Sequence, residues 1–113
     1  MIYFVEMWNA RQEWLALSEE ERANYMNQIG PHIQGLIEKG VKVLTWSDNA
    51  PNTSKRADFD YFAIWSFPDQ ATADEFQQLV ENAGWYQYFD QVNAGGKEDT
   101  ADGVIGRLIG LQA

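Results

Sequence analysis

The sequence predicts an α+β protein with the ferredoxin-like order β-α-β-β-α-β, in which a four-stranded antiparallel sheet carries both helices on one face. Four short apolar or aromatic runs alternate with two stretches whose apolar residues recur every three or four positions. Each of the two helical stretches begins at a capping signal. The 113 residues are the size of one domain, so we expect a single domain over residues 1–113.

The N-terminal part of the chain predicts a strand followed by a long helix. Residues 2–8 are rich in aromatic and β-branched side chains, as in a strand, and residues 9–17 are expected to form a short helical turn. Ser18 and Glu21 make a capping box at the start of the long helix. Gly40 is expected to end this helix. The apolar face of the helix repeats at spacings of three and four residues and consists of Met26, Ile29, Ile33, Leu36 and Ile37.

Pro31 lies inside this predicted helix. It has no amide hydrogen to donate to the carbonyl of Asn27, and its ring crowds the preceding turn. We therefore expect the helix to kink or split near Gly30 and to resume as far as about Lys39.

The middle of the chain predicts a strand pair and a second helix. Residues 41–47 and 59–67 are the expected second and third strands, and a polar loop over 48–58 joins them. Asp69 is the candidate N-cap of the second helix, which Gly84 ends. The apolar face of that helix consists of Ala73, Phe76, Leu79, Val80 and Ala83.

The C-terminal segment is expected to complete the sheet. Residues 85–89 are expected to form a short helix or turn, and residues 93–102 a polar loop that contains Gly95 and Gly96. Residues 104–111 are rich in Val, Ile and Leu, so we predict the fourth strand there. In the ferredoxin-like order this last strand lies next to the first.

The predicted strands are apolar on both faces of the sheet. Along the third strand, Tyr61 and Trp65 lie on one face, whereas Phe62 and Ile64 lie on the other. Two helices cover only one face, and a large exposed apolar face favours aggregation. We therefore predict a homodimer in which two sheets pack face to face about a two-fold axis.

The chain resembles the dimeric α+β-barrel superfamily. The resemblance rests on the element order, the two-sided aromatic strands, the Phe67-Pro68-Asp69 step into the second helix, and the segment Gly84-Trp85-Tyr86-x-Tyr88-Phe89 after it. That superfamily includes antibiotic-biosynthesis-type monooxygenases that need no cofactor, EthD-like and YCII-like proteins, and haem-degrading oxygenases. The chain is most similar to an uncharacterised family of short proteins that start Trp-x-Ala-Arg-x-Glu-Trp-Leu, here Trp8 to Leu15.

The resemblance covers nearly the whole chain and implies the fold more strongly than any activity. Haem-degrading members use an Asn, a Trp and a His around haem. Asn9 and Trp65 resemble the first two, but the second helix of this chain contains no histidine. We therefore expect no haem and no other cofactor.

The composition limits the partners of the protein. Asp and Glu number 17 against 8 Lys and Arg, a net charge of −9, which argues against binding to nucleic acid. No cysteine is present, which excludes disulfides, a thiolate nucleophile and Cys-ligated zinc, and no metal-binding motif is present. No apolar run approaches the ~20 residues of a membrane span or the pattern of a signal peptide, so we expect a cytoplasmic protein without membrane contact.

Four polar residues, His32, Glu6, Arg107 and Asn9, are candidates for catalysis or ligand binding. His32 is the only histidine and is either a general base or an ordinary half-exposed helix residue. Glu6 and Arg107 are charged residues within apolar runs, so they form either a cross-strand ion pair or a site where Arg107 binds a carboxylate or phenolate ligand. The resemblance adds Asn9 as a catalytic candidate.

The candidate ligand-binding residues are Trp8, Tyr61 and Trp65, together with Glu6. Their strand positions favour a pocket between the helices and the sheet of each protomer. The loop over 48–58 and the Gly95-Gly96 segment are its expected gates.

Three functions remain open from the sequence. The first is binding of a small aromatic or apolar molecule by a homodimer. The alternative is a cofactor-independent monooxygenase or isomerase that acts on an aromatic or polyketide-like compound, and the third is a structural dimer without a ligand.

Overall fold

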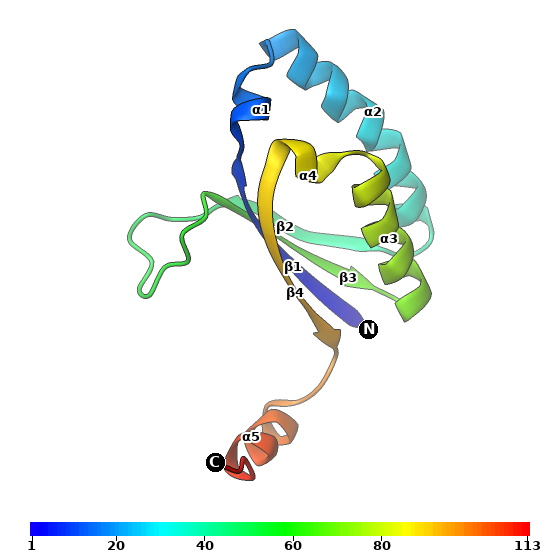
Figure 1. The fold of residues 1–113 in the computed structure, drawn as a ribbon. Coiled ribbons are helices and arrows are strands. Elements are labelled where there is room, and N and C mark those ends of the chain that lie inside the picture. The colour runs from blue at the N-terminus through cyan, green and yellow to red at the C-terminus, as the bar shows by residue number, and fades with distance from the viewer.

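The computed structural model describes residues 1–113 and contains a four-stranded antiparallel sheet whose helices lie on one face (Figure 1). The spatial order of the strands is β2-β3-β1-β4, with β1 and β3 in the centre. This is the ferredoxin-like order, so the predicted fold class is confirmed. The strands are β1 (Ile2–Ala10), β2 (Lys42–Asp48), β3 (Tyr61–Phe67) and β4 (Phe89–Lys97).

Two long helices and two short ones lie over the sheet: α1 (Gln12–Leu15), α2 (Glu19–Glu38), α3 (Gln70–Asn82) and α4 (Trp85–Tyr88). The predicted capping box is present, because Ser18 Oγ accepts from the Glu21 amide at 3.1 Å and Glu21 Oε1 accepts from the Ser18 amide at 3.0 Å. Asp69 Oδ1 likewise accepts from the Thr72 amide at 2.8 Å. These bonds satisfy amides that a helix start leaves free, and they fix where α2 and α3 begin. No helix of the chain has the length and apolar character that crossing a bilayer requires.

Helix α2 is not split at Pro31. It runs as one helix of 20 residues with Pro31 inside it. Pro31 is exposed, and its missing amide removes a single bond from a long ladder. The expectation that the helix divides near Gly30 is therefore wrong.

The fourth strand lies earlier in the chain than predicted. Strand β4 pairs with β1 along its whole length, from Ile2 opposite Lys97 to Ala10 opposite Phe89. Residues 101–109, expected to lie in a strand, form helix α5 (Ala101–Ile109), which Thr100 caps by accepting from the Gly103 amide at 3.0 Å. The prediction of a strand here is wrong, because the apolar residues of this segment recur at spacings of three and four, which suits a helix face.

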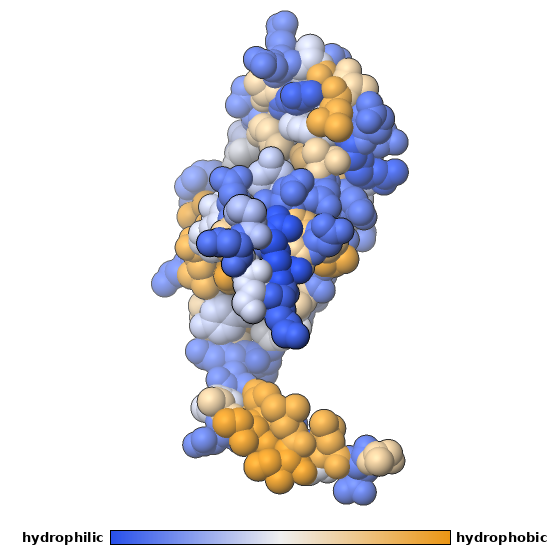
Figure 2. Space-filling model, turned by 90° about the vertical axis from the view of Figure 1, so that its left-hand side faces the viewer, coloured by the Kyte–Doolittle hydropathy of each residue, from blue (hydrophilic) through white to orange (hydrophobic).

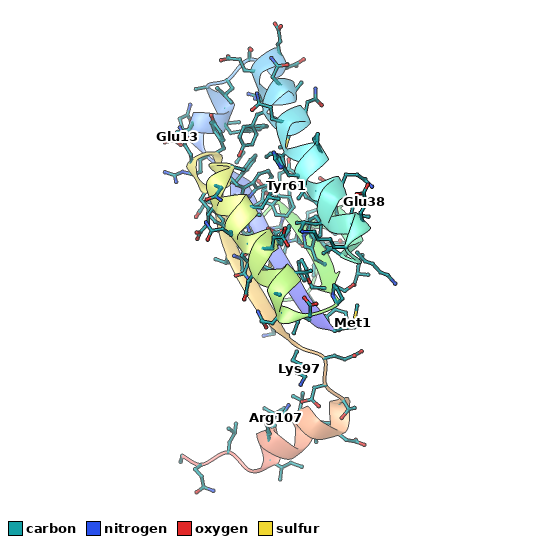
Figure 3. All side chains as sticks on the ribbon, turned by 90° about the vertical axis from the view of Figure 1, so that its right-hand side faces the viewer. Met1, Glu13, Glu38, Tyr61, Lys97 and Arg107 are labelled. Carbon is teal, nitrogen blue, oxygen red and sulfur yellow. The ribbon has the colours of Figure 1, made fainter.

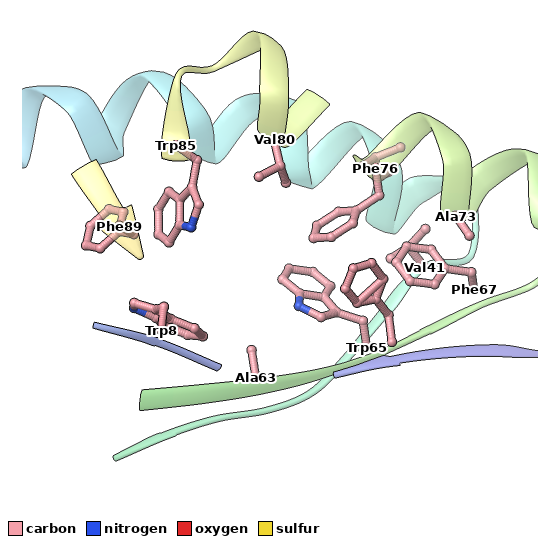
Figure 4. Close-up of a cluster of buried hydrophobic side chains, with 12 residues drawn as sticks. Trp8, Val41, Ala63, Trp65, Phe67, Ala73, Phe76, Val80, Trp85 and Phe89 are labelled. Carbon is pink, nitrogen blue, oxygen red and sulfur yellow. The ribbon is translucent and has the colours of Figure 1, made fainter. Parts of the chain in front are cut away.

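The core lies between the helices and one face of the sheet. Trp8 and Trp65 extend from the strands toward Phe76 and Trp85 of the helical layer (Figure 4). The strand residues on this face alternate with residues that point to the other side. The opposite face, called the outer face below, carries Tyr3, Val5, Met7, Phe62, Ile64, Val92 and Ala94, and no element of the chain covers it.

Helix α5 stands apart from the rest of the protein. It follows the end of β4 after three residues and extends beyond the sheet (Figures 1 and 3). The radius of gyration is 16.4 Å, against about 13 Å for a compact domain of this length. The extended C-terminal segment accounts for the difference in shape.

Candidate functional site

A cavity of about 280 Å³ lies between the sheet and helices α2 and α3. Twelve of its fifteen lining residues are apolar. The lining comprises Glu6, Met26, Ile29, Gly30, Ile33, Gln34, Ile37, Val43, Trp46, Trp65, Phe76, Leu79, Val80, Ala83 and Trp85. An apolar cavity with few polar groups is the usual form of a small-molecule site.

The cavity has a closed floor and an open mouth. Its floor is made by buried side chains such as Trp65, Phe76 and Trp85. The lining residues Ile37 of α2 and Trp46 of β2 are 39% and 51% exposed, so the mouth lies between α2 and the edge strand β2. Aromatic side chains, Trp46 among them, form the walls between this mouth and the floor.

Helix α2 leaves most of its apolar stripe unburied. Of its 20 residues only Leu36 is buried, although the stripe predicted from the sequence continues along the helix. Ile29 and Ile33 are half-buried and line the cavity, and Met26 is exposed at its edge. Ile29 and Ile33 also pack against the core, but the stripe as a whole is less covered than the apolar face of an ordinary amphipathic helix.

Glu6 is the one charged group in the lining. Its side chain is buried, with the residue 4% exposed, and both of its oxygens accept hydrogen bonds. Trp65 Nε1 donates to Oε1 at 2.6 Å, and Gln91 Nε2 donates to Oε2 at 2.8 Å. Each carboxylate oxygen keeps a further lone pair that a bound molecule can use.

A chain of hydrogen bonds connects Glu6 to the surface. Gln91 Oε1 accepts from Trp85 Nε1 at 2.7 Å, which fixes the orientation of the Gln91 amide. Gln91 Nε2 also donates to Asn93 Oδ1 at 2.8 Å, and Asn93 is exposed. Gln91 and Asn93 lie on the helix side of β4 because they pair with Trp8 and Glu6 of β1. This edge strand is thus polar on its inner side and serves the buried carboxylate.

The surroundings of Glu6 favour its neutral form. Burial raises the pKa of the Glu6 carboxyl above its ordinary value, and the hydrogen bonds from Gln91 and Trp65 offset part of that rise. A carboxyl group with a raised pKa in an apolar pocket is a candidate for proton transfer with a bound molecule.

The predicted aromatic residues lie at and beside the cavity. Trp65 lines it directly. Trp8 lies behind the wall, where its ring centroid is 5.0 Å from Trp46 and 6.1 Å from Trp85. Tyr61 stacks on Trp8 at 5.9 Å on the far side of the cluster. Trp8 and Tyr61 therefore support the lining rings and do not line the cavity themselves.

His32 and Arg107 are not in the cavity. His32 lies in a separate groove on the outside of α2 and α3, near Gln28 and Glu75. Arg107 belongs to α5 and donates to Asp99 at 2.6 Å (Figure 3). The expected Glu6–Arg107 ion pair is therefore wrong, because it assumed that Arg107 lies in the strand beside β1.

Asn9 has a structural role in the loop before β3. Its Oδ1 accepts from the Asp60 amide at 2.8 Å, and its Nδ2 donates to the Asp58 carbonyl at 3.2 Å. The loop projects away from the helices (Figure 1), and none of its residues lines the cavity. Gly95 and Gly96 belong to β4 and do not line it either. Neither expected gate is at the mouth.

Several residues of the site were not singled out from the sequence. Gln34 lies at the mouth of the cavity, and Trp46 and Trp85 form part of the wall. Gln91 holds Glu6, but its role depends on β4, whose position was mispredicted. No three His, Asp or Glu side chains are grouped so as to hold a metal ion.

Comparisons with known proteins show the family and the fold. A family model described as "Family of unknown function (DUF6616)" matches residues 1–111. No curated protein matches the chain. A crystal structure of a protein provisionally named a chlorite dismutase is similar over 96% of this chain, with a TM-score of 0.64 and 18% identity. The chain spans 50% of the length of that protein, so the likeness concerns the fold of about half of it.

Proposed function

The chain belongs to the DUF6616 family of unknown function, and we propose that it binds one small apolar or aromatic molecule in the cavity beneath α2. The supporting observation is the apolar stripe of α2, which lines a cavity of about 280 Å³ and of which only Leu36 is buried. A ligand there buries the stripe and completes the contact between α2 and the sheet. Burial of apolar surface is the main source of affinity in such sites.

The dimensions and polarity of the cavity limit the ligand. A volume of about 280 Å³ is at the small end of ordinary ligand sites, so the ligand has one or two rings. Its body is apolar, because polar groups are offered only at Gln34 near the mouth and Glu6 at the floor. A net charge of −9 also disfavours an anion.

Isothermal titration calorimetry with 2-naphthol, a two-ring neutral probe, tests the proposal. We expect one molecule to bind each chain. Ile33→Trp fills the cavity and is expected to weaken binding about tenfold or more, equivalent to 1.4 kcal/mol. Gln28→Trp, which adds the same ring on the outside of the same helix, and His32→Ala, in the outer groove, are expected to bind as the wild type does.

Two results contradict ligand binding in this cavity. One is the absence of heat with 2-naphthol, indole and haem alike, which leaves a structural protein. The other is unchanged affinity in Ile33→Trp, which places the ligand elsewhere on the chain.

A second candidate function is isomerisation by proton transfer, and the observation that favours it is Glu6. Its carboxylate lies in an apolar cavity and is oriented by Trp65 and Gln91. In its ionised form it accepts a proton from the carbon next to a ligand carbonyl, which leaves an enolate, and the neutral carboxyl returns that proton to the same or a conjugated carbon. The step consumes no oxidant, reductant or cofactor. The oxygenase alternative has less support, because of its candidate residues Asn9, His32 and Trp65 only Trp65 lines the cavity.

Deuterium exchange into 2-tetralone, a two-ring ketone, tests the isomerase proposal. In D₂O the wild type is expected to exchange the hydrogens next to the carbonyl faster than buffer does, as followed by NMR. Glu6→Gln is expected to lose this acceleration and to keep the affinity for 2-naphthol. Equal exchange by both proteins removes Glu6 as the base but leaves ligand binding in place.

The uncovered outer face supports a homodimer. Its centre is apolar and uncharged, so two copies can meet there about a two-fold axis without opposing charges. Sedimentation equilibrium is expected to give about twice 12.9 kDa. Val92→Lys on the outer face is expected to shift the equilibrium to monomer, whereas Gln78→Lys on α3 leaves it unchanged. A wild-type monomer contradicts the homodimer.

A further inference from the structure

We propose that α5 and the residues after it form an arm that packs against a second copy of this chain, beside the outer face of its sheet. This inference rests on the homodimer of the proposed function. It adds a second contact surface that the sheet faces alone do not supply.

The apolar side of α5 has no cover within the chain. No residue of the helix is buried. Val104 and Ile105 are about half exposed, and Leu108 and Ile109 are 61% and 80% exposed. Figure 2 shows the hydrophobic side chains gathered over this helix, apart from the largely polar surface of the body in that view. An isolated nine-residue helix is marginal in water, so this one requires packing to persist.

The direction of the arm is fixed by contacts at its base. The Glu98 amide donates to the Met1 carbonyl at 2.9 Å, and Tyr3 Oη donates to the Glu98 carboxylate at 3.4 Å. Asp99 then pairs with Arg107 at 2.6 Å. The link between β4 and α5 is therefore tied to β1 at one end and to α5 at the other.

The arm and the outer face meet in one continuous hollow. Tyr3, Val5 and Ala94 of the outer face and Val104 of α5 line it together. A second copy that packs on the outer face therefore also contacts α5. By two-fold symmetry, each copy then receives the arm of the other.

Area and charge favour a second copy as the occupant. Four strands spaced about 4.8 Å apart, with seven residues of about 3.3 Å each in β2 and β3, give the sheet face a footprint of roughly 450 Å². A standard interface buries about 800 Å² on each partner. The arm supplies further apolar surface at the edge of this face, and α5 carries only Asp102 and Arg107 as charged residues.

Sedimentation equilibrium of two matched variants tests the arm. Leu108→Glu and Gln112→Glu each add one negative charge to the C-terminal segment, but only the first removes an apolar contact. We expect Leu108→Glu to raise the dissociation constant of the dimer at least about tenfold, and Gln112→Glu to raise it much less. A wild-type monomer overturns both the homodimer and the arm.

Paramagnetic relaxation shows which copy the arm touches. The chain has no cysteine, so Gln112→Cys carries a single nitroxide label. This labelled chain is mixed with unlabelled, ¹⁵N-enriched chains, and we expect broadening of amide signals from residues 2–97 of the enriched copies. A label at Gln78→Cys on α3 is the control and is expected to give none.

The same measurements distinguish the arm contact between copies from two other arrangements. Broadening only when nitroxide and ¹⁵N are on the same chain means that the arm folds onto its own sheet, which overturns the proposal. A dimer with equal dissociation constants in both variants and no broadening between copies retains the sheet contact and also overturns the arm.

Discussion

At the scale of single residues, Glu6 determines what the cavity can do. Its neighbours in β1, Phe4 and Trp8, are buried core residues, so alternation alone places Glu6 inside. A buried carboxylate is costly unless hydrogen bonds compensate it. Trp65 and Gln91 supply those bonds and leave Glu6 facing the cavity. The same bonds also satisfy the buried indole N–H of Trp65, so Glu6 both completes the core and lines the cavity.

The raised pKa of Glu6 predicts a pH dependence of stability. Because the pKa is higher in the folded protein, the folded chain keeps the Glu6 proton at pH values where the unfolded chain has lost it. The free energy of unfolding therefore falls as the pH rises from about 4.5 through the folded pKa, by up to about 1.4 kcal/mol per pH unit.

Urea unfolding of the wild type and Glu6→Gln at about pH 4.5 and about pH 7.5 measures this contribution, since titration of the other carboxyls cancels in the difference. We expect the stability of Glu6→Gln relative to the wild type to increase with pH. A difference that stays constant between the two pH values contradicts a raised pKa.

Strand alternation made two of the site residues predictable and the other candidates not. Glu6 and Trp65 line the cavity because they lie on the helix side of their strands, as the apolar pattern of the sequence indicates. His32 is next to Ile33 in sequence, but one position on a helix is a rotation of about 100°, and this carries it to the outer groove. The sequence does not single out Gln34, because a polar residue at the edge of a helix's apolar face does not differ in sequence from an ordinary surface residue.

At the scale of elements, helix α2 combines a well-capped start with a weak middle. The capping box at Ser18 fixes its start, whereas Gly30, Pro31 and Gly35 lie in its interior. These residues lower its intrinsic stability. If a ligand binds under its apolar stripe as proposed, we expect it to offset this weakness and to stabilise α2.

Substitution of Pro31 tests the stability of α2. Pro31→Ala restores an amide donor and is expected to raise the free energy of unfolding by about 1–3 kcal/mol. Gly35→Ala, where an added Cβ meets nothing within 4 Å, is the control for helix propensity alone and is expected to add up to about 1 kcal/mol. Urea unfolding measures both, and destabilisation by Pro31→Ala shows that the packing of α2 requires proline at this position.

Elements with a strong local signal were predictable, and the edge of the sheet was not. Both long helices begin at the capping residues that the sequence indicates, and three strands lie close to their expected positions. Strand β4 was missed because its inner side is polar: Gln91 and Asn93 connect Glu6 to solvent. That polarity is explained only by Glu6, which lies 85 residues from Gln91 in the sequence and contacts β4 only in the folded protein.

At the scale of the whole molecule, charge opposes the assembly that the apolar surfaces favour. Each copy carries a net charge of −9, so two copies repel one another at long range. The outer face and the apolar side of α5 are uncharged in their centres, and the hydrophobic effect acts only at contact. Association is therefore sensitive to screening.

Raising the ionic strength is expected to tighten the dimer. The screening length falls from about 30 Å at 0.01 M to about 8 Å at 0.15 M, which weakens the repulsion while the apolar contact remains. Sedimentation equilibrium at these two salt concentrations is expected to show a dissociation constant several-fold lower at the higher one. A constant that rises with salt means that ion pairs, and not apolar contacts, hold the interface.

The tryptophan cluster gives this protein an unusual optical property. The ring centroids of Trp8, Trp46, Trp65 and Trp85 lie 5.0 to 6.3 Å from their neighbours, and the rings are steeply inclined to one another. Indole transitions held this close and this rigidly share their excitation, and they produce a paired positive and negative band in circular dichroism. That band overlaps the helical signal, so a helix content calculated from the spectrum departs from the true content. Because three of these rings line the cavity, we expect the band to change when the proposed ligand binds there, so that binding is measurable without an added dye.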